Sequence, residues 1–261
     1  MRSRAGASVA ALAVLWCAPG LTSQDRAGAP ERARGGIIRG STAARRIALE
    51  FTGHEFAEGG TAILEELARR GARASFFLTG DFLRTPAFAP LIRRIIEDGH
   101  YLGPHSDTHL LYCDWDARDR TLVTREAFVR DLENNLQAIE AFGVRRGDVR
   151  YWVPAYEWYN AEIAAWSAGL GLTLVNFTPG TRSNADYTGE GDRNFVPSQR
   201  IYDSILARER EDPHGLNGYL LLLHVGAGPG RADKMHHRLG SLLDDLSARG
   251  YRFVRVDELL R

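Results

Sequence analysis

The sequence predicts a single-domain α/β fold, a barrel of parallel strands surrounded by helices. Three observations carry this prediction: strand-like and helix-like segments alternate about seven times, the composition does not change along them, and no glycine-rich nucleotide-binding turn follows the first strand. Alternation at this spacing is typical of βαβ units around one core. Without a Gly-x-Gly-x-x-Gly turn or a Gly-Lys-Ser/Thr phosphate loop, a barrel is favoured over an open nucleotide-binding sheet.

Short apolar runs predict the strands, and apolar residues three and four apart predict the helices between them. The expected strands are residues 46–51, 74–78, 101–103, 151–153, 172–177, 219–224 and 251–256. The first helix is expected to have its N-cap at Thr61 and to end at Gly71. The later helices are expected over apolar stripes at 91–96 and 128–139, and over 160–168, 198–211 and 235–249.

The N-terminal residues predict an export signal followed by a linker. Arg2 and Arg4 precede an apolar core at 9–18, and small residues follow it. We therefore expect a signal peptide at 1–20, a linker at 21–44 that contains a short edge strand at Ile37–Ile38, and the catalytic domain at 45–261. The apolar core is too short to span a bilayer comfortably, so we expect an exported protein, periplasmic or extracellular, with no stable membrane span.

The charge balance and the cysteine count exclude some classes of protein. Lys plus Arg and Asp plus Glu are 33 each, so the formal net charge is zero. A dedicated nucleic-acid binder would show a strong basic excess, and we expect no nucleic-acid partner. Only Cys113 remains after cleavage of the expected signal peptide, so an internal disulfide and a cysteine-based zinc site are both excluded.

Parallel barrels place their chemistry where strands end and loops begin. Four of the eight histidines follow predicted strands, namely His54, His105, His109 and His224. The loops at the same ends of the predicted strands also carry Glu55, Tyr156, Glu157, Trp158 and Asp186. We therefore expect these side chains to share one rim of the barrel.

His105 and His109 are the strongest candidates for metal ligands. A spacing of four places both imidazoles on one side of a helical turn, and neutral imidazole nitrogens are good zinc ligands. His224 ends the apolar run 219–223, which predicts an imidazole held rigidly at a cleft mouth, where it can serve as a general acid. The plainer alternatives are a solvated pair of loop histidines and a histidine bonded to a backbone carbonyl.

Aromatic residues are concentrated in one short segment. Five of them lie within residues 151–159, whereas the whole-chain fraction of 10% predicts about one. Some of them must pack in the core, and others offer a flat apolar wall to a sugar ring. Trp158, Glu157 and the more distant Trp115 are the expected substrate-binding residues.

These segments resemble the polysaccharide deacetylases, which are also called carbohydrate esterase family four or the NodB-homology domain. His-Ser-Asp-Thr-His at 105–109 resembles the family's His-Ser/Thr-x-x-His metal motif, and Leu-Leu-His at 222–224 resembles its Leu-x-His motif. The segments 71–77 and 250–259 are also similar to the family. The resemblance runs from about residue 47 to the C-terminus.

The resemblance implies a distorted (β/α)7 barrel, a divalent metal that is commonly zinc, and hydrolysis of N- or O-linked acetyl groups on a glycan. It also implies roles for three residues. The backbone N–H of Tyr156 would help to hold the tetrahedral oxyanion. His224 would protonate the departing amine or alcohol, and Asp186 would tune His224.

Two motifs depart from the family. Its first motif is usually Thr-Phe-Asp-Asp-Gly, in which one aspartate is the base and the next is a metal ligand. Here residues 50–54 read Glu-Phe-Thr-Gly-His, and both aspartates are absent in register. The arginine that orients the base in the third motif falls here on Trp152 or Val153. The absence of the arginine is consistent with the absence of the aspartates, because an arginine without its carboxylate would be an unpaired cation.

Two explanations remain open. In the first, His54 replaces the metal aspartate beside His105 and His109, and Glu55 or Glu157 supplies the base, which gives a zinc site with an open position for water. In the second, the domain has lost hydrolysis and binds acetylated glycan passively. We favour the first, because the histidine pair is retained together with the distant acid. Hydrolysis of phosphate esters is disfavoured, since no phosphate cradle or cluster of carboxylate ligands is evident.

Overall fold

Strand β3 (Arg46–Gly53) is the centre of the fold, because it pairs with three other strands. The computed structural model describes residues 28–261. Its main sheet has the order β5-β4-β3-β8, and β9 also pairs with β3. Every pair in this sheet is parallel, as the sequence predicted. The bounds of these partner strands are β4 (Ser75–Leu78), β5 (Tyr101–Pro104), β8 (Tyr219–His224) and β9 (Arg252–Val254).

A second, two-stranded sheet completes the wall of the barrel. Strands β6 (Tyr151–Trp152) and β7 (Thr173–Leu174) are parallel to each other. The Val153 N–H donates to Pro104 O at the end of β5, and the Thr178 N–H donates to Leu220 O on β8. These bonds join the second sheet to β5 and β8 and so close the ring of strands. The barrel is distorted, because strand pairing in this part is short and interrupted. Strand β7 is shorter than the predicted 172–177.

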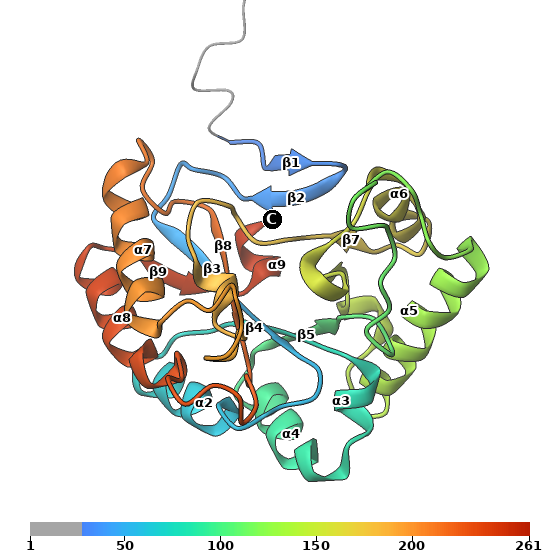
Figure 1. Ribbon diagram of the computed structural model, residues 1–261, viewed down its shortest axis with the longest axis horizontal. Coiled ribbons are helices and arrows are strands. Elements are labelled where there is room, and N and C mark those ends of the chain that lie inside the picture. Colours follow the sequence, from blue (N-terminus) through green and yellow to red (C-terminus); the bar gives the residue numbers. More distant parts are fainter. Residues whose placement is uncertain (1–27) are drawn as a thin grey trace, which may run out of the picture.

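Helices surround the strands (Figure 1). Their bounds are α2 (Gly60–Arg69), α3 (Gly80–Arg84), α4 (Ala89–Glu97), α5 (Arg125–Glu140), α6 (Ala161–Gly169), α7 (Ser198–Glu211), α8 (His236–Ala248) and α9 (Val256–Leu259). Short 3-10 turns are η1 (Pro86–Phe88), η2 (Arg146–Asp148), η3 (Ala155–Glu157) and η4 (Ser183–Ala185). The predicted cap at Thr61 was wrong: α2 begins at Gly60 with Gly59 as its N-cap, so Thr61 lies inside the helix.

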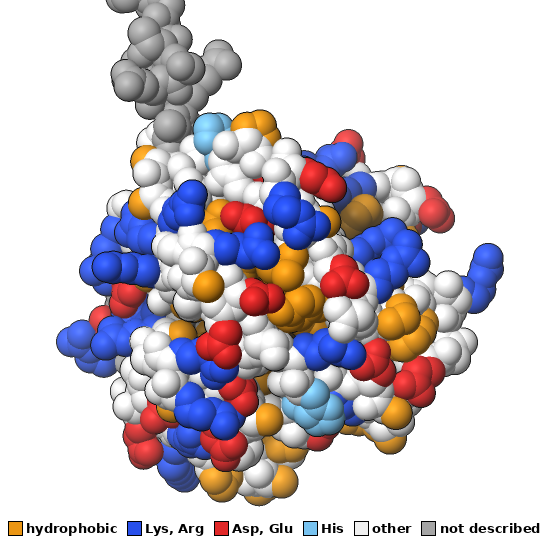
Figure 2. All heavy atoms as spheres, turned by 90° about the vertical axis from the view of Figure 1, so that its left-hand side faces the viewer, with side chains coloured by type: hydrophobic (Ala, Val, Ile, Leu, Met, Phe, Trp, Pro, Cys, Tyr) orange, Lys and Arg blue, Asp and Glu red, His pale blue; other side chains and the backbone are white. Residues whose placement is uncertain are grey.

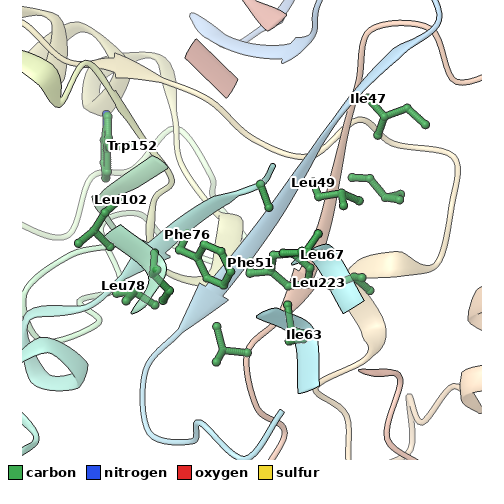
Figure 3. Close-up of a cluster of buried hydrophobic side chains, with 14 of the residues drawn as sticks. Ile47, Leu49, Phe51, Ile63, Leu67, Phe76, Leu78, Leu102, Trp152 and Leu223 are labelled. Atoms are coloured by element: carbon green, nitrogen blue, oxygen red, sulfur yellow. The ribbon is translucent and has the colours of Figure 1, made fainter. Parts of the chain in front are cut away.

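The core lies between the sheet and the helices. Ile47, Leu49 and Phe51 alternate along β3 in one core cluster, and Leu49 and Phe51 lie nearest to Ile63 and Leu67 of α2 (Figure 3). All of these side chains are almost completely buried. Each contributes about 1.5–3 kcal/mol by leaving water. The even-numbered residues of β3 therefore face the barrel interior, because successive side chains of a strand point to opposite faces.

The N-terminal part of the described chain belongs to the barrel. Strands β1 (Glu31–Ala33) and β2 (Gly36–Arg39) form an antiparallel hairpin. Ile37 is 4% exposed and forms a parallel bridge with Val175, next to β7. The expected linker at 21–44 is therefore corrected over 31–39, where an ordered hairpin covers one end of the barrel. The expected signal peptide at 1–20 lies outside the described residues.

The surface of the described chain carries both signs of charge. On the face shown in Figure 2, basic and acidic side chains are interspersed. No helix within residues 28–261 is long and apolar enough to cross a membrane.

Candidate active site

One cavity of about 480 Å³ lies at the carboxyl ends of the parallel strands. The register explains why, because Thr52 pairs with His224, Gly53 with Leu78, and Leu78 with Pro104, so β3, β4, β5 and β8 end at one edge. The loops after β3, β5, β6 and β8 supply most of the lining. The lining residues are Thr52, Gly53, His54, Glu55, Phe56, His105, His109, Trp115, Tyr156, Glu157, Asn184, Tyr187, His224, Gly226 and Ala227. All four histidines that follow predicted strands therefore share this cavity.

His105 and His109 are brought together by a tight loop, so the predicted helical turn was wrong. Ser106 and His109 have φ angles of 74° and 58°. Non-glycine residues in this left-handed region carry strain that the surroundings must support. The loop is supported by Asp131 on α5, whose carboxylate accepts the N–H groups of Asp107 and Thr108. The two imidazole centroids lie 5.1 Å apart.

Asn135, one turn further along α5, fixes the start of the same loop. Its Oδ1 accepts the His105 N–H at 2.8 Å, and its Nδ2 donates to Leu78 O at 3.1 Å. The His105 ring is also fixed, because Nδ1 lies 2.9 Å from Val153 O, which accepts its proton and leaves Nε2 as the free nitrogen. Burial lowers the pKa of His105 well below its ordinary value, and His109 adds to the effect. The ring is therefore neutral, which is the form that binds a metal.

His54 reaches the pair from the loop after β3. Its ring stacks on that of His109, with centroids 4.6 Å apart and planes 10° apart. Its Nδ1 lies 3.2 Å from the hydroxyl of Thr79, which also caps α3. Burial lowers the pKa of His109 to about 3, and His54 and His224 contribute to this shift.

The three imidazoles share a cavity, but their nitrogens do not converge. Stacked rings direct their in-plane lone pairs side by side rather than toward one point. Within residues 28–261, no three His, Cys, Asp or Glu side chains form a ready ligand set for a metal ion. The donor chemistry still fits zinc, because His105 and His109 are neutral, and the bond from His105 Nδ1 to Val153 O leaves Nε2 of that ring for the ion.

His224 is coupled to a carboxylate. Asp186 Oδ1 lies 2.7 Å from His224 Nδ1, and Asp186 Oδ2 accepts the His224 backbone N–H at 2.9 Å. Burial acts to lower the pKa of His224, but Asp186 and Glu157 outweigh it and the pKa is raised. The structure therefore brings together His224 and Asp186, which the sequence paired only loosely as a predicted acid and its tuning carboxylate.

The two candidate bases differ in their surroundings. The side chain of Glu55 is 67% exposed, and its Oε1 lies 3.9 Å from His54 Nε2. The side chain of Glu157 is 10% exposed, and its Oε1 lies 3.9 Å from His105 Nε2. Burial raises the pKa of Glu157 to about 7, a rise that His224 opposes and Asp186 strengthens. Glu157 thus lies deep in the cavity, whereas Glu55 lies at its edge.

Aromatic side chains form the rim of the cavity. Five large hydrophobic side chains are exposed within residues 28–261, and four of them line this cavity: Phe56, Trp115, Tyr156 and Tyr187. Tyr156 has a left-handed φ of 60° and packs against His109. Trp158, which was expected to bind substrate, does not line the cavity; its ring centroid lies 5.4 Å from that of Trp115.

Sequence reasoning missed the residues that position the site. Asp131 and Asn135 lie on the buried face of α5, among its apolar residues. Glu50 faces the barrel interior close to Glu157, and Tyr187, in the long loop before α7, lines the cavity and packs against His224. The available signal was a pair of polar residues four apart at core-facing positions of a helix, which requires polar partners to satisfy it.

These features define an α/β-barrel protein with an enzyme-like cavity at the carboxyl ends of its strands. The family model for polysaccharide deacetylase matches residues 39–175, just over half of the chain, and the chain belongs to that family. A chitooligosaccharide deacetylase of Rhizobium leguminosarum bv. trifolii is 27% identical over 202 residues, which are 72% of this chain and 80% of the relative. The peptidoglycan-N-acetylglucosamine deacetylase PgdA of Listeria monocytogenes is 24% identical over 221 residues, 82% of this chain but 39% of that protein.

Solved structures share the fold. PdaA of Bacillus subtilis, a family 4 carbohydrate esterase, superposes with a TM-score of 0.68 at 21% identity, covering 87% of this chain and 85% of that one. A family 4 pseudoenzyme of Bacillus anthracis has a TM-score of 0.66 at 18% identity, covering 88% and 70%. A mutant of that pseudoenzyme has restored enzymatic activity. The distorted barrel that the sequence resemblance implied is confirmed.

Proposed function

We propose that this protein is a metal-dependent hydrolase that removes acetyl groups from a polysaccharide or oligosaccharide. One observation carries the proposal: the strand-end histidines, among them His224 held by Asp186, and a buried glutamate all line one cavity. Relatives named as chitooligosaccharide, peptidoglycan and chitin deacetylases support an acetylated glycan as the substrate. The N-terminal residue pattern supports export to the periplasm or the extracellular space.

We assign the metal to His54, His105 and His109, with zinc as the expected ion. A bound zinc ion polarises a carbonyl and lowers the pKa of its water ligand. The stacking of His54 on His109 requires the His54 ring to rotate before the three rings act together. Val153 O accepts the Nδ1 proton of His105, so that ring is held in the tautomer that leaves Nε2 free, and the Thr79 hydroxyl lies beside Nδ1 of His54.

The remaining residues act on protons and on substrate position. Glu157 is better placed than Glu55 to take a proton from the attacking water, because it is buried beside His105 and its pKa lies near neutrality. His224, held by Asp186, protonates the departing amine or alcohol. The Tyr156 N–H stabilises the oxyanion, and Trp115 offers an apolar face to a sugar ring.

The test is acetate release by the purified protein from N-acetylglucosamine oligomers and from acetylated xylan oligomers, with and without added zinc. We expect release from at least one of them and about one zinc ion per chain. His105→Ala should lose both properties. Retention of the full zinc content by this variant would contradict the site assignment.

A passive glycan-binding domain is the second candidate. The two aspartates of the first motif are replaced by Thr52 and Gly53, and the fold is shared with a pseudoenzyme. This candidate predicts affinity for acetylated glycans with no acetate release at any metal loading.

A further inference from the structure

A cavity of about 680 Å³ lies at the amino ends of β5 and β6. Tyr101 begins β5 and Tyr151 begins β6, and both line it. Its other walls come from the end of α4, from the segment 143–150 that includes η2, and from the segment 255–261 that includes α9. The active-site cavity lies at the carboxyl ends of the strands and shares no described residue with this one, so the two are separate.

The side chains of this amino-end cavity carry more positive than negative charge. Its charged members are Arg145, Arg150, Arg255, Arg261, Asp148 and Asp257. Four arginines against two aspartates leave an excess of two positive charges, although the whole chain has as many basic as acidic residues. The charge of this lining therefore favours an anionic ligand.

Both aspartates are already bonded to arginines of the lining. Arg145 donates to both carboxylate oxygens of Asp148, and Arg255 donates to both of Asp257. Arg261 also donates to Asp257, through Nη2 at 3.1 Å. Two cations thus share the Asp257 carboxylate, and part of the positive charge stays uncompensated.

The donors left for a ligand lie around Tyr151. The guanidinium of Arg150 and the hydroxyl of Tyr151 have no bonded partner within residues 28–261. Burial and Asp257 raise the pKa of Tyr151, whereas Arg150 and Arg261 oppose the rise, so both guanidiniums lie near this hydroxyl. The side chain of Arg261 is 72% exposed and keeps donors beyond its bond to Asp257.

His100 adds an N–H donor from a mostly buried ring of the lining. The residue is 7% exposed, and its Nδ1 accepts the Ala74 N–H at 3.1 Å, so the proton of the neutral ring is on Nε2. This Nε2 has no bonded partner in the described part of the chain. Burial lowers the pKa of His100 to about 4, and nearby arginines add to the effect against Asp98, so the ring stays neutral. Its unpaired N–H favours a ligand that brings an acceptor.

We propose that the amino-end cavity binds a phosphate monoester of a small organic molecule. The groups left for a ligand can all donate, and a phosphate group offers three strong acceptor oxygens and a charge that suits guanidinium forks. The volume lies in the range of small-molecule sites and exceeds what a bare phosphate ion needs. Ile96, Leu102 and Val144 give the organic group an apolar surface.

The experiment measures binding by calorimetry with the purified full chain. The probes are phenyl phosphate, inorganic phosphate, benzoate and benzyl alcohol, with ortho-phenanthroline present because this neutral chelator removes metal ions without competing as an anion. We expect phenyl phosphate to bind at least about tenfold more tightly than each of the other three. Absence of phenyl phosphate binding overturns the proposal, equal affinity for inorganic phosphate overturns the organic part of the ligand, and equal affinity for benzoate overturns the choice of phosphate.

Variants locate the ligand in this cavity. Arg150→Gln, at an exposed position, should lower the affinity for phenyl phosphate at least about tenfold, and Tyr151→Phe should lower it about threefold or more. Arg130→Gln, at an exposed position of α5 outside the cavity, is the matched control and should stay within about twofold of wild type. Unchanged affinity in Arg150→Gln overturns the proposal; if that variant fails to fold, Arg261→Gln decides by the same criterion.

One further variant separates this site from the active-site cavity. His105→Ala should keep the affinity for phenyl phosphate, since His105 lines only the active-site cavity. Loss of binding in this variant would place the ligand at the active site and overturn the proposal. Acetate release is not part of the measurement, so the proposed function is tested independently.

Discussion

Glu50→Gln should stabilise the protein at alkaline pH and leave its stability near pH 4.5 almost unchanged. Glu50 is completely buried on the inner face of β3, and neither carboxyl oxygen has a hydrogen-bond partner within residues 28–261. Burial, with the charge of Glu157 adding to it, raises the pKa of Glu50 from 4.5 to about 8. The folded protein therefore holds a neutral carboxylic acid here at neutral pH, and glutamine is a neutral side chain of nearly the same shape.

The magnitude follows from proton linkage. The unfolded chain releases this proton near pH 4.5 and the folded chain releases it near pH 8, so between these values the folded state binds more protons. The free energy of unfolding therefore falls as the pH rises through this window. About 3.5 pH units at 1.36 kcal/mol each give a loss on the order of 5 kcal/mol, complete above pH 8. Glutamine removes this loss, so the variant gains up to that amount at pH 8.5.

The assay is urea unfolding of the wild type and Glu50→Gln at pH 4.5 and pH 8.5, followed by tryptophan fluorescence with a chelator present. The free energy of unfolding is compared between the two proteins at each pH. The change in this difference from pH 4.5 to pH 8.5 reports on Glu50, because all other titrating groups are common to both proteins. Glu65→Gln, the same substitution at an exposed position of α2, is the matched control. A stability difference between wild type and Glu50→Gln that is the same at both pH values would refute the reasoning.

Three further predictions concern the site. Glu157→Gln should lower kcat for acetate release by about 10²–10⁴-fold, whereas Glu55→Gln should keep kcat within about threefold of wild type. A larger loss in Glu55→Gln than in Glu157→Gln would assign the general base to Glu55 instead. Asp186→Asn should lower kcat by at least about tenfold, because it removes the carboxylate that orients His224; an unchanged kcat would leave Asp186 without that role. Asn135→Ala should lower the free energy of unfolding by about 1–3 kcal/mol, since the buried His105 N–H and Leu78 O lose their partner, and an unchanged urea midpoint would contradict this.

Most of the fold could be predicted because hydrophobic periodicity directly reflects burial. The strand at 219–224 and the helix at 198–211 were predicted with the bounds that the structure gives them. The expected edge strand at Ile37–Ile38 is confirmed within β2, but its pairing with β1 was not predicted, because the sequence there is rich in Gly and Arg and Ile37 becomes buried only through contact with a distant part of the chain. Tertiary packing of this kind leaves little local signal.

The residues that line the cavity could largely be predicted, but the relative positions of their side chains could not. Parallel strands end at one edge, so His54, His105 and His224 were expected to meet. The left-handed backbone at His109 and the stacking of His54 on it depend on loop conformations that no periodicity encodes. The depth of Glu157 relative to Glu55 depends on the turn at 155–157, which places two successive residues at positive φ.

The altered first motif and the buried glutamates fit one physical explanation. Glu50 and Glu157 already interact closely enough for the charge of Glu157 to raise the pKa of Glu50. An aspartate at position 52, on β3 opposite His224, would add a third carboxyl group to the same buried region, and like charges there oppose each other's ionisation. Thr52 avoids that repulsion, and the expected place of the family's arginine, Trp152 or Val153, holds no cation that would need an aspartate partner. The buried carboxyl group that lines the cavity is therefore Glu157, which follows β6 rather than β3.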